Sequence, residues 1–294
     1  AQALEAGLSP AAIRHAIRPG GPWQHLAPGL YASFTGHLTP RQRLSCALLH
    51  AGDEAILSGA DAARAHELRY VPEQLRPVVL VPPHVRTSST PFVTIRRISH
   101  LPEPRWLSGL PVAPVERAVI DACLPDSSLF VAGPTLQDVR AIVCESVQRR
   151  ITTPDRLAAA VSRLRRNGTR LLRVAVADVR AGCWSAPECE FRDLVRASRL
   201  LPEPYWNQPL PDLPHLTPDG WWEEARLVIE IDSAEHHQRG LTPEQTQERH
   251  AEIVATGWTV LSIGPRRIRR APAQLLLEVE AAYRVGLARA RGYR

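Results

Sequence analysis

Apolar and polar residues alternate with a period of two near residue 230. Two short runs, 219–222 and 227–232, flank a polar tetrad at 223–226, and the second run is β-branched and apolar at alternate positions. This pattern predicts a β-hairpin. If the turn is centred on the tetrad, Asp219 lies directly across from Glu230, with the two side chains about 5 Å apart on one face.

The alternation also divides the side chains of the hairpin between two faces. One face collects three carboxylates, those of Asp219, Glu230 and Asp232. The other face is apolar and consists of Trp222, Leu227, Ile229 and Ile231. Closely packed anions repel each other, so this arrangement favours a bound divalent cation or protonation of some of the acids. The alternative is structural: Asp219 would belong to a Pro-Asp turn, and Asp232 would cap the end of a strand.

Helical and strand patterns alternate around the hairpin. A capping-box signal opens a helix over 185–198, and Thr242 to Gly257 has the start and stop signals of another helix. A strand over 258–263 and a closing helix from Pro265 follow. This order predicts an α/β core for residues 181–294, a mixed sheet flanked by helices.

The N-terminal segment, residues 1–38, has the spacing of a helix-turn-helix followed by a wing. The first helix is short, and the chain lacks an initiator Met, so we expect the numbering to start after the true N-terminus. Ser9 would cap the second helix, whose inward positions are expected to be Ala12, Ile13, Ala16 and Ile17. Its open face would carry the DNA-binding residues Arg14, His15 and Arg18. Runs at 23–26 and 30–33 predict a two-stranded wing; the alternative is an αα-hairpin packed on the next domain.

Residues 39–180 predict an α/β middle domain. Helices are expected over 40–51, 58–66, 114–123, 135–149 and 154–164, and strands over 76–81 and 91–98. No His, Cys or acidic cluster at ligand spacing is found there, so Asp121 and His66 are interpreted as structural polar groups. The arginine pair 96–97 and Arg163, Arg165 and Arg166 are interpreted as solvated faces, with phosphate contact as the alternative.

Composition narrows the class of protein. The net charge of +6 and the pI of about 9.5 favour a polyanionic partner. Five cysteines without C-x-x-C spacing are expected to be buried thiols in a reducing cytoplasm. The sequence has no apolar run of about 18 residues and no charged-then-apolar leader, so we expect a cytoplasmic protein with no membrane partner.

The acidic motif of the last third resembles the PD-(D/E)xK nuclease superfamily, specifically its branch similar to the very-short-patch (Vsr) repair endonuclease. The matching residues, within 185–283, are Pro218, Asp219, Glu230, Ile231 and Asp232, with Glu188 on a preceding helix and His237 after them. Members usually carry Lys where this chain has Asp232, and the chain contains no lysine. The Vsr branch also lacks that Lys and uses His instead.

This resemblance implies a site for Mg²⁺ or Mn²⁺. We expect Asp219, Glu230 and the carbonyl of Ile231 to bind the metal, with Asp232 acting through water. His237, or its neighbour His236, would relay the proton of the nucleophile. We expect Arg249 to hold the phosphate. The resemblance adds Glu188 as a helix acid beside the metal, whereas its position in the capping box gives it a structural explanation.

The first 180 residues resemble winged-helix antitoxin domains of the AbiEi type. Trp23, the Pro28-Gly29 pair and Tyr31 match the pattern W-x-x-L-x-P-G-x-Y. The resemblance implies DNA binding in a toxin–antitoxin context, and it leaves a toxin or repair partner and the oligomeric state open.

Together these features predict a cytoplasmic, Mg²⁺-dependent DNA endonuclease with an N-terminal DNA-binding module. One alternative is a non-catalytic, antitoxin-like transcriptional repressor with a degenerate nuclease domain. Another is a protein-interaction adaptor.

Overall fold

The computed structural model describes residues 2–231 and 242–292. It is a mixed α/β structure that divides into two compact units. The first unit comprises 1–142 and 156–172, and the second comprises 143–155 and 173–294. The predicted division into 1–38, 39–180 and 181–294 stays a prediction. Within the described ranges, no helix is both long and apolar enough to cross a membrane.

The first unit begins with two short helices and a hairpin. These are α1 (Gln2–Glu5), α2 (Pro10–Ala16), β1 (Gln24–Ala27) and β2 (Leu30–Ala32). Ser9 caps α2 by accepting a hydrogen bond from the Ala12 amide at 3.1 Å, as predicted. β1 and β2 pair antiparallel, which confirms the predicted two-stranded hairpin. The predicted inward face of α2 is wrong in part, because no residue of α2 is buried and Ala12 is exposed.

A five-stranded sheet follows in the order β5-β4-β3-β7-β6. Its strands are β3 (Ile56–Ser58), β4 (Val78–Val81), β5 (Thr94–Arg97), β6 (Arg105–Leu107) and β7 (Leu110–Val112). The helices of this part of the chain are α3 (Pro40–Ala51), α4 (Gly59–Ala65), α5 (Val115–Cys123), α6 (Leu136–Gln148), α7 (Pro154–Ser162) and α8 (Arg170–Arg180). The predicted helices and the two predicted strands are present. Central strand β3 was not predicted.

The second unit contains a four-stranded mixed sheet in the order β11-β10-β9-β8. Its strands are β8 (Tyr205–Trp206), β9 (Gly220–Trp222), β10 (Leu227–Ile231) and β11 (Thr259–Ile263). β10 pairs parallel with β11 and antiparallel with β9, which in turn pairs antiparallel with β8. The helices are α9 (Ala186–Ala197), α10 (Pro243–Ala255), α11 (Pro265–Arg270) and α12 (Pro272–Gly292). The predicted flanked mixed sheet is confirmed at this level.

The predicted single closing helix is wrong, because it breaks at Ala271. That residue has φ −140° and ψ 52°, outside the helical region. Pro272 follows, and a proline both disfavours the helical conformation of the residue before it and lacks an N–H for the helical ladder. Two helices, α11 and α12, therefore replace one.

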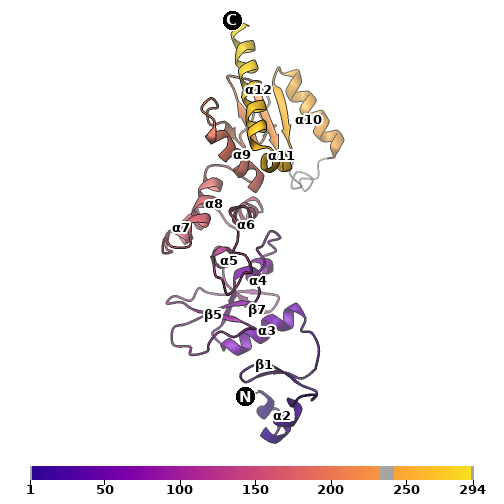
Figure 1. The fold of residues 1–294 in the computed structure, drawn as a ribbon, viewed down its shortest axis with the longest axis vertical. Helices are drawn as coiled ribbons and strands as arrows, with labels where there is room; N and C mark the ends of the chain where they lie inside the picture. The colour runs from indigo at the N-terminus through magenta and orange to yellow at the C-terminus, as the bar shows by residue number, and fades with distance from the viewer. Residues whose placement is uncertain (1, 232–241, 293–294) are drawn as a thin grey trace. The chain divides into compact units, whose positions relative to one another are not determined.

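The predicted hairpin register is confirmed. Trp222 pairs with Leu227, and Gly220 pairs with Ile229. The two faces pack separately, and α10 lies on the opposite side of the sheet from α9 and α12 (Figure 1). The apolar face of the hairpin packs on α9, α11 and α12, through Trp222, Leu227, Ile229, Ile231, Phe191, Ile268 and Val279 among others. The other face carries Trp221 and Val228, which pack on Ile253 of α10.

Candidate functional site

Two acidic side chains are buried where the hairpin pairing ends. Continuing the register by one residue beyond the Gly220–Ile229 pair sets Asp219 opposite Glu230. Their exposed fractions are 1% and 3%. Both belong by alternation to the face that carries Trp221 and Val228, so apolar side chains packed on α10 cover the sheet beside them.

The Asp219 carboxylate lies against the backbone of β10. Its Oδ2 accepts a hydrogen bond from the Ile231 amide at 2.7 Å. This bond fixes the carboxylate beside the residue whose carbonyl was expected to complete the metal-binding face. Two of the three predicted metal-binding residues are therefore in direct contact.

Glu230 forms an ion pair with Arg249 of α10. The Nε and one terminal nitrogen of Arg249 each lie 3.0 Å from Glu230 Oε1, and the terminal nitrogen also donates to the Thr217 carbonyl at 2.7 Å. Arg249 is the residue expected from the sequence to hold a phosphate. In this structure its guanidinium instead binds one of the two acids, and the DNA contact of Arg249 stays a prediction.

Glu188 occupies the first turn of α9, where Ser185 is the N-cap. The Ser185 hydroxyl accepts from the Glu188 amide at 3.3 Å, as the capping box predicted. The Glu188 carboxylate, however, accepts from the amide of Trp184, the residue before the cap, at 2.9 Å. It also accepts from the side-chain amide of Asn207 at 2.8 Å. The carboxylate thus joins the helix start to a residue of another element.

Asn207, which the sequence analysis left without a role, connects this helix acid to the hairpin. Its backbone N–H donates to the Asp219 carbonyl at 3.1 Å, and its side chain donates to Glu188 and to the Gly182 carbonyl. Asn207 has φ +49°, a left-handed conformation that Asn tolerates better than most residues. An Asn directly after a short strand was the only sequence signal for it.

A cluster of thiols lies next to Glu188 in the sequence and in space. Cys144 and Cys189 have their sulfurs 3.8 Å apart, and Arg192 donates to Cys183 at 3.8 Å. A hydrogen bond with Cys189 and burial raise the pKa of Cys183 far above its ordinary value. Hydrogen bonding among the thiols and burial also raise the pKa of Cys189, so Cys183 and Cys189 stay protonated. The expectation of buried thiols is confirmed for Cys123, Cys144, Cys183 and Cys189, whereas Cys46 is only partly buried.

Several predicted site residues are not brought together. Asp232, His236 and His237 lie outside the described residues. Within the described part of the chain, no group of three or more His, Cys, Asp or Glu side chains is arranged to hold a metal ion. The expected DNA-binding residues Arg14, His15 and Arg18 are exposed and belong to the first unit.

The donors at the hairpin end suit a hard cation in type. Asp219 and Glu230 supply carboxylate oxygens, the ligands that Mg²⁺ and Mn²⁺ prefer. Arg249 already neutralises Glu230, so a cation at that carboxylate would have to replace the guanidinium. The residues present thus fit a metal once Arg249 has moved away.

Comparison with known proteins adds no assignment. The chain matches no family model, and comparisons with curated proteins and with solved structures likewise give no match.

Proposed function

We propose that the protein is a metal-dependent DNA endonuclease whose second unit hydrolyses phosphodiester bonds. The observation that supports this proposal best is the burial of two carboxylates, Asp219 and Glu230, which the extended hairpin register sets opposite each other. Like charges buried near each other destabilise a fold unless a cation or a proton compensates them, so buried acid pairs are more typical of functional sites than of scaffolds.

The chemistry requires a positive charge between these acids and a phosphate. A divalent metal ion lowers the pKa of bound water and neutralises the charge that develops on the phosphoryl oxygens. Asp219 and Glu230 would hold that ion, with the Ile231 carbonyl as a third donor. The bond from the Ile231 amide keeps the Asp219 carboxylate in position for this task.

Arg249 has two roles in this proposal. In the structure it compensates the charge of Glu230. If Glu230 held a metal ion, its charge would no longer need the guanidinium of Arg249. The released Arg249 can then bind a phosphate in a bidentate manner, which planar guanidinium groups do well.

The roles of two further residues in this proposal come from the family resemblance alone. Asp232 would act through a metal-bound water. His237 would accept or relay the proton of the nucleophile, because imidazole titrates near neutral pH. The exposed basic residues of the N-terminal segment would bind the DNA backbone, and the net charge of +6 supports a polyanionic partner.

The test is strand breakage in supercoiled plasmid with Mg²⁺ or Mn²⁺. We expect nicking by the wild type and its loss in Asp219→Asn. Asp212→Asn is the matched control, because Asp212 also follows a proline but binds Arg226 and Trp258 in the same unit. Circular dichroism checks that both variants fold. Wild-type protein that breaks no strand with either metal, or equal nicking by wild type and Asp219→Asn, would overturn the proposal.

One observation favours a second function, that of a non-catalytic DNA-binding repressor. The ion pair with Arg249 occupies Glu230, one of the expected metal-binding carboxylates. A degenerate site would keep this pair permanently. Retardation of DNA by both wild type and Asp219→Asn, with no strand breaks, would support the repressor.

A further inference from the structure

An open cleft of about 570 Å³ lies in the first unit, and the hairpin acids do not line it. Three segments border it: residues 98–100 after β5, residues 114–120 at the start of α5, and residues 156–164 of α7 and the turn after it. The size lies within the range of clefts that bind small organic molecules.

The wall of this cleft is largely apolar. The lining side chains of this kind are Ile98, Pro114, Ile120, Ala159, Ala160 and Leu164. The two alanines leave room between α7 and α5 that larger side chains would fill. A surface of this kind gains free energy by burying a flat or apolar group.

Three arginines stand at the same cleft, with Glu116 as the acidic residue of its lining. Arg156 pairs with Glu116 through Nε at 2.9 Å, and the side chain of Arg156 remains 62% exposed. Arg163 is exposed, and no ion-pair partner for it is found within the described ranges. The charge at the cleft is therefore positive after the internal pair has been formed.

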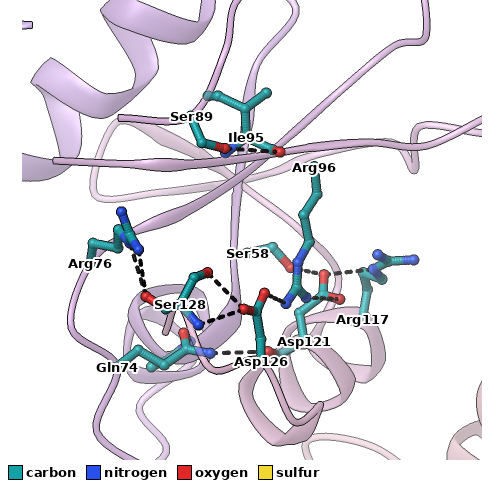
Figure 2. Close-up of polar contacts among 11 residues, drawn as sticks. Ser58, Gln74, Arg76, Ser89, Ile95, Arg96, Arg117, Asp121, Asp126 and Ser128 are labelled. Atoms are coloured by element: carbon teal, nitrogen blue, oxygen red, sulfur yellow. Dashed lines mark hydrogen bonds and ion pairs between the residues drawn. The ribbon is translucent and has the colours of Figure 1, made fainter. Parts of the chain in front are cut away.

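Asp121 fixes the position of the Arg117 guanidinium. Its Nε donates to Asp121 Oδ2 at 2.7 Å, and Asp121 also accepts from Ser58 at 2.6 Å and from Arg96 at 3.1 Å. Figure 2 shows the terminal nitrogens of Arg117 pointing away from this network. A guanidinium fixed through Nε keeps those terminal N–H groups for a second anion, and its fixed position lowers the entropic penalty of binding.

From this arrangement we infer that the cleft binds a small organic phosphate with a flat, apolar body, the chemical class to which nucleotides belong. Arg117 and Arg163 bind the phosphate, and the apolar wall of α5 and α7 takes the body. An isolated inorganic ion would leave that wall exposed to water. A neutral apolar molecule would leave the arginines without a counter-charge.

Isothermal titration calorimetry of the full chain with AMP, GMP, CMP and UMP tests this inference. EDTA is present, so that a metal-dependent site elsewhere does not contribute. We expect at least one nucleotide to bind with 1:1 stoichiometry, and the matching nucleoside and inorganic phosphate to bind at least about tenfold more weakly, because each supplies only half of the contacts.

Variants locate the site. Arg163→Gln should weaken binding about tenfold, and Ala159→Trp should abolish it by filling the cleft. Arg165→Gln is the matched control, because Arg165 is an exposed arginine two positions away that does not line the cleft. Thermal unfolding shows whether each variant folds, and Asp219→Asn should bind like the wild type.

Three results would overturn the inference. Absence of binding by all four nucleotides at millimolar concentration would exclude the ligand class. Phosphate that binds as tightly as the nucleotides would mean a simple anion site. Equal weakening by Arg163→Gln and Arg165→Gln would mean diffuse attraction to a basic surface.

Discussion

Each unit buries a carboxylate, and the two carboxylates have opposite surroundings. Asp121 in the first unit is fully buried and receives hydrogen bonds from Ser58, Arg96 and Arg117 (Figure 2). Asp219 in the second unit is equally buried, but the position opposite it on the paired strand is another acid, Glu230. The first carboxylate is bound by two arginines, whereas the strand register sets the second opposite another acid.

This difference shows that burial alone does not identify a functional acid. The bonds to Asp121 come from β3, β5 and α5, so the carboxylate ties two strands of a sheet to a helix. Opposite charges explain such a residue without any ligand. A pair of like charges requires a compensating group, and Arg249 is that group for Glu230.

The largest expected effect is on Asp121. Asp121→Asn keeps the shape of the side chain but removes the anion that Arg96 and Arg117 share, while Arg96 keeps its second partner, Asp126. The free energy of unfolding of the first unit should therefore fall by about 3 kcal/mol. Urea titration followed by circular dichroism measures it. Asp53→Asn, at an exposed aspartate of the same unit, should change stability by less than about 0.5 kcal/mol. Equal effects of the two substitutions would contradict the structural role of Asp121.

Arg249→Met tests the compensation in the second unit. Without metal, the variant leaves Glu230 buried without its ion pair to Arg249, and we expect a loss of about 2 kcal/mol. Mg²⁺ should restore part of this loss, because a ligand that binds only the folded state stabilises it. Differential scanning calorimetry with and without Mg²⁺ gives both values. Arg267→Met, which breaks the exposed pair with Glu278, is the control. A Mg²⁺ effect of the same size in both variants would place the cation elsewhere.

Asp219→Asn should behave unlike Asp121→Asn. The substitution removes one of two like charges, and the Asn carbonyl can still accept from the Ile231 amide, so stability should change by less than about 1 kcal/mol and should rise rather than fall. Strand-breaking activity should fall at least about 100-fold. Thermal unfolding together with the plasmid assay measures both. A destabilisation as large as that of Asp121→Asn would make Asp219 a structural acid.

The smallest expected effect is the pH dependence at Glu203, a half-exposed acid paired with Arg192. Burial would raise the pKa of Glu203, but hydrogen bonds from Trp206 and Arg192 and the arginine charges outweigh it and lower the pKa below the ordinary value of 4.5. A lowered folded-state pKa stabilises the fold above the unfolded-state pKa, and this contribution disappears as the pH falls through the folded-state value.

Glu203→Gln should therefore reduce stability by less than about 1 kcal/mol at neutral pH. The difference from wild type should begin to shrink below the ordinary pKa of 4.5 and should vanish as the pH falls through the lowered folded-state pKa. Urea titrations between pH 7 and pH 3 measure it, and Glu223→Gln at an exposed position is the control. A difference of the same size at pH 7 and at pH 3 would show that the pair does not act through charge.

The elements that sequence predicted well have a strong local period. The hairpin register followed from the alternation of Leu227, Ile229 and Ile231 about a four-residue turn. The structural interpretation of Asp121 also held, since it binds Ser58, Arg96 and Arg117. His66 bonds the Ala113 carbonyl at 2.8 Å, in agreement with its predicted structural role.

The features that sequence could not predict depend on contacts between distant elements. β3 has only three residues, all buried, too few to show a period. The pair of Glu230 and Arg249 depends on where α10 crosses the sheet, and nothing local to either residue fixes that crossing. The cleft in the first unit arises where α7 meets α5, and from the sequence Arg163 was interpreted only as part of a solvated face.

The two-residue strand β8 at the sheet edge determines the position of two acidic residues. Asn207, which follows it directly, holds Glu188 with its side chain and Asp219 with its backbone. Asn207 thus bridges the start of α9 and the β9–β10 hairpin. A shift of β8 by one residue would displace Asn207 and would therefore move both Glu188 and Asp219, although neither residue belongs to β8.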